Sequence, residues 1–305
     1  MRVGIIGRTG TLLKSADAIR AQGHQIAFVL TCKSEFFYDK KENNFKDYAK
    51  LIGVPFFNTL DLSSISKELI SFNADICISI NWLTLIPKSF LSIFPFGILN
   101  AHSGDLPRYK GNACPNWAIL NFESKIGLTI HKITEELDSG PYLLKRYLNI
   151  NEETYIKDIY TWIESIVPSM FVNALDLLLT NGLIEQDKTL RTLRTYPRKP
   201  QDSRINWSDT RRSILANIRA SSHPFDGAFC FLNDTDSRVV IYRASKHEID
   251  FDFLAIPGQV CLSVNGQPVI SAPDGLILLE EFSIDGCSNA ESNSLIIKSL
   301  RNRLC

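Results

Sequence analysis

The sequence predicts an α/β fold, in which a mostly parallel N-terminal sheet with helices on both faces precedes a smaller, β-rich C-terminal domain. Two patterns predict it. In the first half of the chain, short continuous apolar runs alternate with helical patterns, as they do in a parallel sheet that is buried on both faces. After residue 200, short apolar runs are separated by turn signals such as Asn265-Gly266 and Asp274-Gly275. We therefore expect a Rossmann-like sheet followed by a barrel-like (OB-like) domain.

Alternating strands and helices account for the first 184 residues. The predicted strands cover 3–6, 25–30, 75–80, 98–102, 126–133 and 142–150, and the predicted helices cover 12–22, 45–52, 64–72, 113–122 and 155–179. Gly23 and Gly53 follow two of these helices, where a left-handed cap favours glycine. In 155–179 the apolar side chains recur mostly at helical spacing, for example at Ile159, Ile163 and Val167.

A change of composition near residue 185 divides the chain. At 305 residues it is long for a single core. Residues 185–200 are polar and basic and contain Pro197 and Pro200, which indicates a solvated linker between a domain at 1–184 and one at 201–305. In the second domain we expect a helix at 208–221 and strands at 228–232, 239–244, 258–264, 268–271 and 276–282.

Charge and cysteine content favour a cytoplasmic protein whose partner is a small molecule. Lys and Arg number 33, as do Asp and Glu, so the net charge is zero, and the one basic cluster lies at 191–199. A protein that binds a large nucleic acid usually carries a basic excess, so this balance argues against one. The seven cysteines include no CxxC pair, which fits a reducing compartment. We expect neither a membrane span, which needs an apolar run of roughly 18 residues, nor a signal peptide.

Polar side chains gather where the predicted strand 98–102 ends. Asn100 and His102 are two residues apart and therefore project from the same face of an extended strand. Open α/β sheets place their active sites at such strand ends. Asp138 follows strand 126–133 in a turn, and it meets the imidazole if the two strands are neighbours. An amide, an imidazole and a carboxylate at one sheet edge suit acyl transfer; the alternatives are a structural histidine and a loop-capping aspartate.

The sequence supports two other kinds of site less well. The loop from Gly4 to Gly10 lacks the full GxGxxG spacing of a dinucleotide site, which leaves an anion-binding loop or a plain tight turn. A zinc site needs three or four ligands, and no second histidine or cysteine is suitably spaced from His102. His131 lies on a predicted strand among apolar neighbours. We therefore predict no metal.

Two separated motifs resemble the signature of the 10-formyltetrahydrofolate-dependent formyltransferases. They are NAHSGDLPRYKG, at 100–111, and GLTIHKITEELDSGPYL, at 127–143, in the order and at the distance found in that family. The segments SINWLTLIPKSFL, RKPQDSRINWSDTRRSILANIRASSHPFDGAFCF, IPGQV and SAPDGLILLEEF extend the resemblance over nearly the whole chain. One departure is a loop that is one residue longer between His102 and Pro107. The pair Asn116-Trp117 is more similar to the sugar N-formyltransferases than to the tRNA enzymes.

The resemblance implies catalytic roles for Asn100, His102 and Asp138, with 10-formyltetrahydrofolate as the formyl donor. It also implies a pterin pocket with apolar walls and main-chain hydrogen bonds. The walls would come from Trp82, Leu85, Ile86 and Leu91, and the hydrogen bonds from Thr134, Glu135 and Leu137, although Leu85, Ile86 and Leu91 also fit a core role. Arg8 and Lys110 are the cations expected to bind the acceptor substrate.

For the amine acceptor, the resemblance and the neutral charge favour a UDP- or dTDP-linked amino-deoxysugar, formylated for a bacterial surface polysaccharide such as the lipopolysaccharide O-antigen. A methionyl-tRNA formyltransferase is the alternative, for which Arg191, Arg194, Arg198 and Lys199 are a partial argument. A hydrolase that releases formate from the folate and a non-enzymatic binding module are two further alternatives. The leading interpretation involves no nucleic acid and no membrane, and it leaves a homodimer open.

Overall fold

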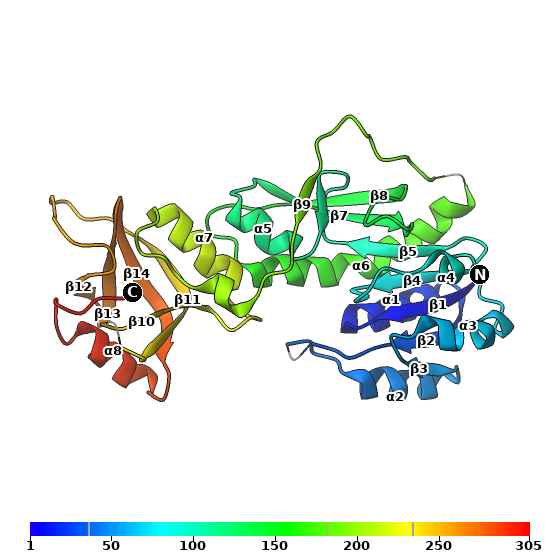
Figure 1. The fold of residues 1–305 in the computed structure, drawn as a ribbon, viewed down its shortest axis with the longest axis horizontal. Helices are drawn as coiled ribbons and strands as arrows, with labels where there is room; N and C mark the ends of the chain where they lie inside the picture. Colours follow the sequence, from blue (N-terminus) through cyan, green and yellow to red (C-terminus); the bar gives the residue numbers. More distant parts are fainter. Residues whose placement is uncertain (36, 181, 234) are drawn as a thin grey trace. The chain divides into compact units, whose positions relative to one another are not determined.

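The computed structural model describes residues 1–35, 37–180, 182–233 and 235–305, and Figure 1 shows its fold. The chain forms two compact units. The first contains Met1–Cys114, Ile126–Leu148 and Tyr160–Tyr196, and the second contains Pro115–Lys125, Asn149–Ile159 and Pro197–Cys305. Two short segments from the first half of the chain therefore belong to the second unit.

A seven-stranded sheet forms the centre of the first unit, in the order β3-β2-β1-β4-β5-β7-β8. Its strands are β1 (Arg2–Gly7), β2 (Gln25–Thr31), β3 (Phe56–Asn58), β4 (Ile76–Ile80), β5 (Ile98–His102), β7 (Lys125–Lys132) and β8 (Tyr142–Asn149). The pairs β1–β2, β2–β3, β1–β4 and β4–β5 are parallel, whereas β7 is antiparallel to β5. The predicted mostly parallel sheet is confirmed, and β3 is a strand that the sequence pattern did not predict.

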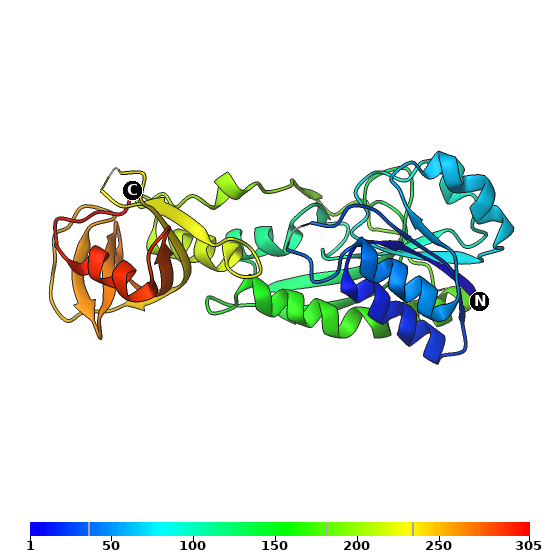
Figure 2. The ribbon, with the colours of Figure 1, turned by 90° about the horizontal axis from the view of Figure 1, so that it is seen from below.

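Helices cover both faces of this sheet (Figure 2). They are α1 (Gly10–Ala21), α2 (Glu42–Ile52), α3 (Leu62–Ser71), α4 (Lys88–Leu91) and the part of α6 (Ile156–Leu179) that follows residue 159. Every residue of β4 is buried, which explains why its sequence is continuously apolar rather than alternating. A core of aromatic side chains packs on one face, where the rings of Phe28 and Phe94 lie 6.1 Å apart. Gly53 ends α2 with a φ of 71°, as its position predicts.

The second unit contains a five-stranded antiparallel sheet in the order β10-β11-β14-β13-β12. Its strands are β10 (Ala228–Phe231), β11 (Arg238–His247), β12 (Val260–Val264), β13 (Gln267–Ala272) and β14 (Gly275–Ile284). The unit also contains the helices α7 (Arg211–Ser221) and α8 (Asn289–Ile297), a 3-10 turn at Pro200–Ser203 and most of α5 (Cys114–Leu120). The β-rich C-terminal domain is confirmed, including all five predicted strands. The Thr210 side chain caps α7 by accepting from the Ser213 amide, as an N-cap threonine is expected to do.

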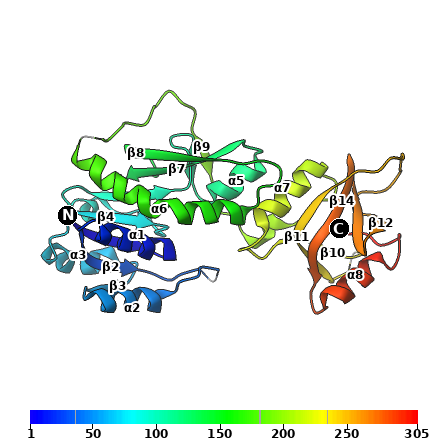
Figure 3. The same cartoon turned by 180° about the vertical axis from the view of Figure 1, so that it is seen from behind.

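The last residues of the chain close this sheet into a barrel-like form (Figure 3). At the β10 edge, the Phe231 and Cys305 main chains exchange two hydrogen bonds of 2.7 and 2.8 Å. At the β12 edge, the Leu304 amide donates to the Gly258 carbonyl at 2.8 Å. Gly258 has a φ of +85°, and a Cβ there would lie 2.1 Å from the Leu304 oxygen, so both its conformation and this close approach require glycine. Residues 302–305 thus pair with both edge strands.

Among the described residues, α6 is the one helix long and apolar enough to cross a membrane, by length and composition alone. α6 is apolar on average, although charged residues such as Glu164 interrupt it, and one such helix is weak evidence that does not overturn the expectation of no membrane span. The core helix of a soluble protein passes the same test. Phe171 and Leu175 of α6 are fully buried within the protein, as they would be in a core helix.

Candidate active site

Asn100 and His102 project from one face of β5, at the end of the strand. Their partners across the antiparallel β5–β7 pair are His131 and Thr129, respectively. Residues directly opposite each other in such a pair share a face of the sheet, so four polar side chains lie together there. His102, Thr129 and His131 are buried, and Asn100 is partly exposed. The strand pairing therefore brings a second histidine to the two predicted residues.

Asp138 reaches the same face from the turn that follows β7. Its Oδ2 lies 3.7 Å from Nδ1 of His102, and its Oδ1 lies 3.6 Å from Nε2 of His131. The amide of Gly111 donates a 2.8 Å hydrogen bond to Oδ2, which fixes the carboxylate. Asp138 has a φ of +47°, a left-handed conformation that is uncommon for a residue other than glycine. The structure thus brings Asn100, His102 and Asp138 together.

The surroundings of His102 favour its protonated form. Its Nε2 donates to the Tyr109 carbonyl at 2.8 Å and lies 3.7 Å from the Cys114 sulfur. Burial by itself lowers the pKa of His102, but the negative charge of Asp138, the Cys114 side chain and the Tyr109 carbonyl outweigh it and raise the pKa to about 9. At neutral pH this side chain is therefore an imidazolium, with a proton on each nitrogen.

His131 is the site residue that sequence reasoning missed, because its neighbours on the strand are apolar. Its Nδ1 lies 3.1 Å from the Lys132 carbonyl, and its Nε2 lies 3.3 Å from Nδ2 of Asn100. Burial, and then the positive charge of His102, lower the pKa of His131 to about 4. These contacts fit a neutral ring that donates from Nδ1 and accepts the Asn100 amide at Nε2. Only the register of the β5–β7 pair, which places His131 opposite Asn100, identifies this histidine as a site residue.

The segment predicted as a solvated linker is partly packed against the site. Within it, β9 (Leu193–Thr195) pairs with β6 (Tyr109–Gly111), a strand that follows the His102 loop. The buried Gln186 donates to the Asp138 carbonyl at 2.8 Å and to the Gly140 carbonyl at 2.7 Å. Residues 185–196 therefore hold two of the loops that carry polar groups of the site. Their polar composition reflects hydrogen bonds to these loops as well as exposure to water.

The residues predicted to bind a pterin differ widely in exposure. Ile86 is buried in the aromatic core with Phe90 and Phe94, so its core role is the one that the structure supports. Leu85 is 63% exposed, whereas Trp82 and Leu91 pack partly against the core. Thr134, Glu135 and Leu137 lie on the turn that carries Asp138, and Lys88 pairs with Glu135 at 3.8 Å. Part of the predicted wall and the predicted turn therefore lie next to each other.

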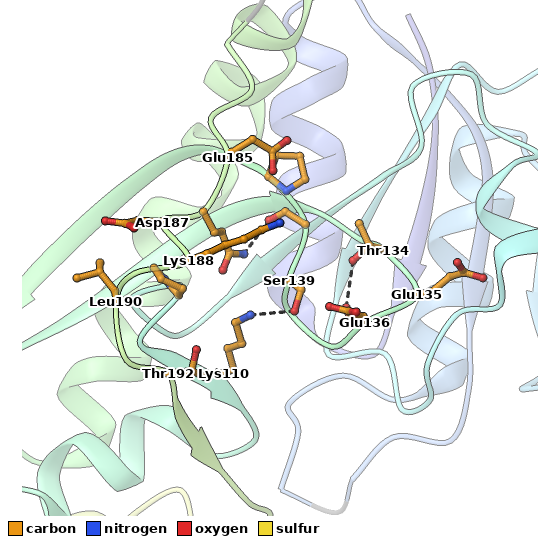
Figure 4. Close-up of a pocket in the computed structure, with 14 residues that line it drawn as sticks. Lys110, Thr134, Glu135, Glu136, Ser139, Glu185, Asp187, Lys188, Leu190 and Thr192 are labelled. Atoms are coloured by element: carbon orange, nitrogen blue, oxygen red, sulfur yellow. Dashed lines mark hydrogen bonds between the residues drawn. The ribbon is translucent and has the colours of Figure 1, made fainter.

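The two cations predicted to bind the acceptor have different surroundings. Arg8 is buried, donates to the Asn81 and Lys33 carbonyls and pairs with Glu35 at 3.2 Å. These contacts already hold the Arg8 guanidinium, and its role in binding the acceptor stays a prediction. Lys110 is partly exposed and donates to the Ser139 hydroxyl at 2.8 Å (Figure 4). It lines a cavity of about 610 Å³ between residues 107–110, 134–141 and 185–192, whose lining includes Thr134 and Glu135 but none of the predicted apolar walls.

Two further sequence hypotheses are resolved by local contacts. At the start of α1, a Cβ on Gly10 would lie 2.7 Å from the Asp39 carboxylate, so an acidic side chain already lies against the loop considered for anion binding. This supports the tight-turn interpretation. Asn116 is buried and donates to the Ala220 carbonyl at 2.8 Å, so this half of the Asn116-Trp117 pair has a structural contact. Within the described residues, no three His, Cys, Asp or Glu side chains form a cluster that could hold a metal ion.

Comparisons with known proteins agree with this geometry. Residues 1–175 match the family model described as formyl transferase, and residues 198–299 match that of the formyl transferase C-terminal domain. The methionyl-tRNA formyltransferase of Pelobacter propionicus is 31% identical over 214 residues, which are 70% of this chain and 65% of that protein. That of Thermodesulfovibrio yellowstonii is 28% identical over 211 residues, covering 69% of this chain and 66% of the relative.

A solved structure shares the fold at lower identity. The N-formyltransferase from Helicobacter canadensis, in complex with folinic acid and dTDP-3-aminofucose, superposes with a TM-score of 0.66 and 20% identity, over 92% of this chain and 99% of that one. The seven-stranded sheet and the barrel-like unit define a two-module fold, and the first module holds a site with an amide, two imidazoles and a carboxylate. The chain belongs to the formyl transferase family and contains both of its modules in order.

Proposed function

We propose that this protein transfers a formyl group from 10-formyltetrahydrofolate to the amino group of a nucleotide-linked amino sugar. In this proposal residues 1–184 are the catalytic domain, 185–200 join it to the next, and 201–305 form the barrel-like domain. The observation that carries the proposal is the buried His102 imidazole 3.7 Å from the largely buried Asp138 carboxylate, beside Asn100. Such a site supplies hydrogen-bond donors and a proton acceptor, as acyl transfer to an amine requires.

Asn100 and His102 are the proposed donors to the formyl oxygen. When the amine nitrogen attacks the formyl carbon, the carbonyl oxygen gains negative charge. The Nε2 proton of His102 is used by the Tyr109 carbonyl, but Nδ1 is 3.7 Å from Asp138, beyond an ordinary hydrogen bond. The Nδ1 proton is thus available to the developing oxyanion, beside the Asn100 amide. Removing one donor of this kind typically costs about 3 kcal/mol in transition-state stabilisation.

Asp138 is the proposed proton acceptor. The amine must lose a proton as its bond to carbon forms, and the bond between the formyl carbon and the folate nitrogen then breaks. Asp138, directly or through a water molecule, takes that proton, which finally goes to the departing folate nitrogen. The carboxylate is held for this role by the Gly111 amide at 2.8 Å. The transfer involves no change of oxidation state, so these groups are sufficient for it.

The formyl donor is proposed to bind between Trp82 and the turn that carries Asp138. The indole nitrogen of Trp82 is buried and has no hydrogen-bond partner among the described residues, which fits a polar ligand next to it. Leu85 and Leu91 offer apolar surface, and the Lys88–Glu135 pair joins the two sides. Apolar walls with a few fixed polar groups suit a flat heterocycle such as a pterin.

Two acceptor substrates are considered for the formyl group. A dTDP-linked amino sugar is favoured by the Helicobacter canadensis structure, which matches both modules over 92% of this chain. Basic and acidic residues are balanced across the chain, whereas tRNA binding favours a basic surface. Methionyl-tRNA is the second candidate, because the curated relatives described above act on it by name. The proposal places the reaction in the cytoplasm, with Lys110 near the acceptor.

A direct assay separates these acceptors. The purified chain is incubated with 10-formyltetrahydrofolate and, in separate reactions, UDP-, dTDP- and GDP-linked amino sugars, methionyl-tRNA or no acceptor. We expect a formamido sugar from one of the sugar reactions, and none of it with His102→Asn or Asp138→Ala. Formyl-methionyl-tRNA as the sole product would select the second candidate. Formate released at the same rate without any amine would make the protein a hydrolase instead.

A further inference from the structure

The geometry points to Gln186 as a positioning residue for Asp138, acting from the segment that follows α6. This inference rests on the proposed function, since it concerns the orientation of the proposed proton acceptor. Gln186 lies 48 positions from Asp138 in the sequence, and its side-chain amide donates both of its hydrogens to the turn around Asp138. It is 7% exposed, so these hydrogen bonds are shielded from competing water.

The two acceptors of Gln186 are main-chain carbonyls that begin at Asp138 itself and enclose Ser139. Its Nε2 lies 2.8 Å from the carbonyl oxygen of Asp138 and 2.7 Å from that of Gly140. Immediately before the first of these carbonyls the main chain has an uncommon conformation, with a φ of +47° at Asp138. Aspartate adopts this conformation more readily than most non-glycine residues do, and contacts from the surroundings fix it. The bidentate amide is a contact suited to enforcing it.

One polar atom of the Gln186 side chain is buried at a cost in free energy, which indicates a role beyond packing. Its Oε1 is buried and accepts no hydrogen bond from the part of the chain that the structure describes. A buried acceptor without a partner is unfavourable, so a residue chosen only for packing would be apolar here. Two residues earlier, Ile184 exchanges two main-chain hydrogen bonds with Tyr142, at 2.9 and 2.8 Å. These main-chain hydrogen bonds fix the segment beside the turn, and they place Gln186 opposite the carbonyls that it binds.

Gln186→Met removes both donors while nearly keeping the shape of the side chain. We expect kcat for formyl transfer to fall about 10- to 100-fold, because small displacements of a catalytic group have effects of that size. The KM values of both substrates should stay within about twofold, since Gln186 is not proposed to contact either. Gln201→Met makes the same chemical change at an exposed position and serves as the matched control.

The titration of His102, followed by NMR, gives a readout that does not depend on turnover. Asp138, Cys114 and His131 are the titratable groups that face this ring. If Gln186 positions Asp138, Gln186→Met lowers the pKa of His102 from about 9, and it has no such effect when Asp138→Asn is already present. A merely structural role would leave the pKa unchanged or would lower it equally in both backgrounds.

The outcomes are separable from those of the proposed function. If His102→Asn and Asp138→Ala abolish transfer while Gln186→Met changes neither kcat nor the His102 titration, the positioning role is wrong and the function stands. If Gln186→Met unfolds, Gln186→Asn keeps the amide but is one methylene too short to reach both carbonyls, and it is expected to give the same loss. A folded Gln186→Asn with wild-type kcat would overturn the inference.

Discussion

The ring of His131 lies directly across the β5–β7 pair from Asn100, with Nε2 3.3 Å from the amide nitrogen. Because Nδ1 of His131 lies 3.1 Å from the Lys132 carbonyl, the ring is oriented with Nε2 toward the site. The neutral ring can then accept one hydrogen of the Asn100 amide. The second hydrogen remains for the formyl oxygen, in an orientation set by the strand pairing.

His131→Leu should therefore lower kcat about 10- to 100-fold, with small changes in KM, because Asn100 loses the group that orients its amide. The measurement is steady-state formyl transfer with the acceptor identified by the assay above. His247→Leu makes the same change in the second unit and should keep the wild-type rate. A rate for His131→Leu within twofold of the wild type would show that Asn100 is oriented by other contacts.

The pH dependence of kcat should reflect the titration of His102. Its folded-state pKa of about 9 lies above the ordinary value of 6.5, so the imidazolium persists through neutral pH and is lost as the pH rises through about 9. By linkage, the stability that this proton contributes is fully present below pH 6.5 and disappears over the same rise. We expect kcat to be flat near neutrality and to fall above about pH 9.

Cys114→Ala tests this assignment without removing a proposed catalytic group. The Cys114 side chain contributes to the raised pKa of His102, after the larger contribution of Asp138. Its loss should move the alkaline fall of kcat to lower pH while leaving the plateau near its wild-type level. The ratio of the two pH profiles cancels the titration of the substrate amine. Identical profiles would mean that the alkaline limb belongs to another group.

Local patterns in the sequence were sufficient for most strands, most helices and two side chains of one strand. Asn100 and His102 were found because i and i+2 share a face, which is a local rule. Asp138 was found because it follows a neighbouring strand in a turn. These inferences require only the direction of each strand and the edge of the sheet at which it ends.

The residues that were missed depend on pairings between distant segments. The apolar neighbours of His131 on β7 predict a core residue, and only the register of the β5–β7 pair shows that it faces Asn100. Gln186 was placed in a polar linker, and its contact with the Asp138 turn spans 48 positions. Arg8 was expected to bind the acceptor, and its contacts with Glu35 and with the carbonyls of Asn81 and Lys33 depend on distant segments. No composition rule distinguishes such side chains from exposed ones.

Gly104→Ala should inactivate the site through a steric conflict. A Cβ at this position would lie 2.4 Å from Nε2 of His102 and 2.4 Å from the Tyr109 carbonyl oxygen. These two atoms form the hydrogen bond that orients the imidazole. We expect kcat to fall at least about 100-fold, since the ring must turn or the main chain must shift. Ser103→Ala, at the adjacent position, is the control in a formyl-transfer assay and should remain active.

Leu304→Ala should destabilise the closure of the barrel-like unit. Leu304 is 1% exposed and packs in the core of that unit, whereas Leu300, four positions earlier, is 59% exposed. Truncation of a buried leucine typically costs about 2–5 kcal/mol, and the same change at an exposed position costs about 0.5 kcal/mol or less. Hydrogen exchange at the Val260 amide, which donates to the Asn302 carbonyl at 3.0 Å, measures the loss locally. We expect faster exchange in Leu304→Ala and unchanged exchange in Leu300→Ala, whereas equal protection in both variants would mean that residues 302–305 add little to the closure.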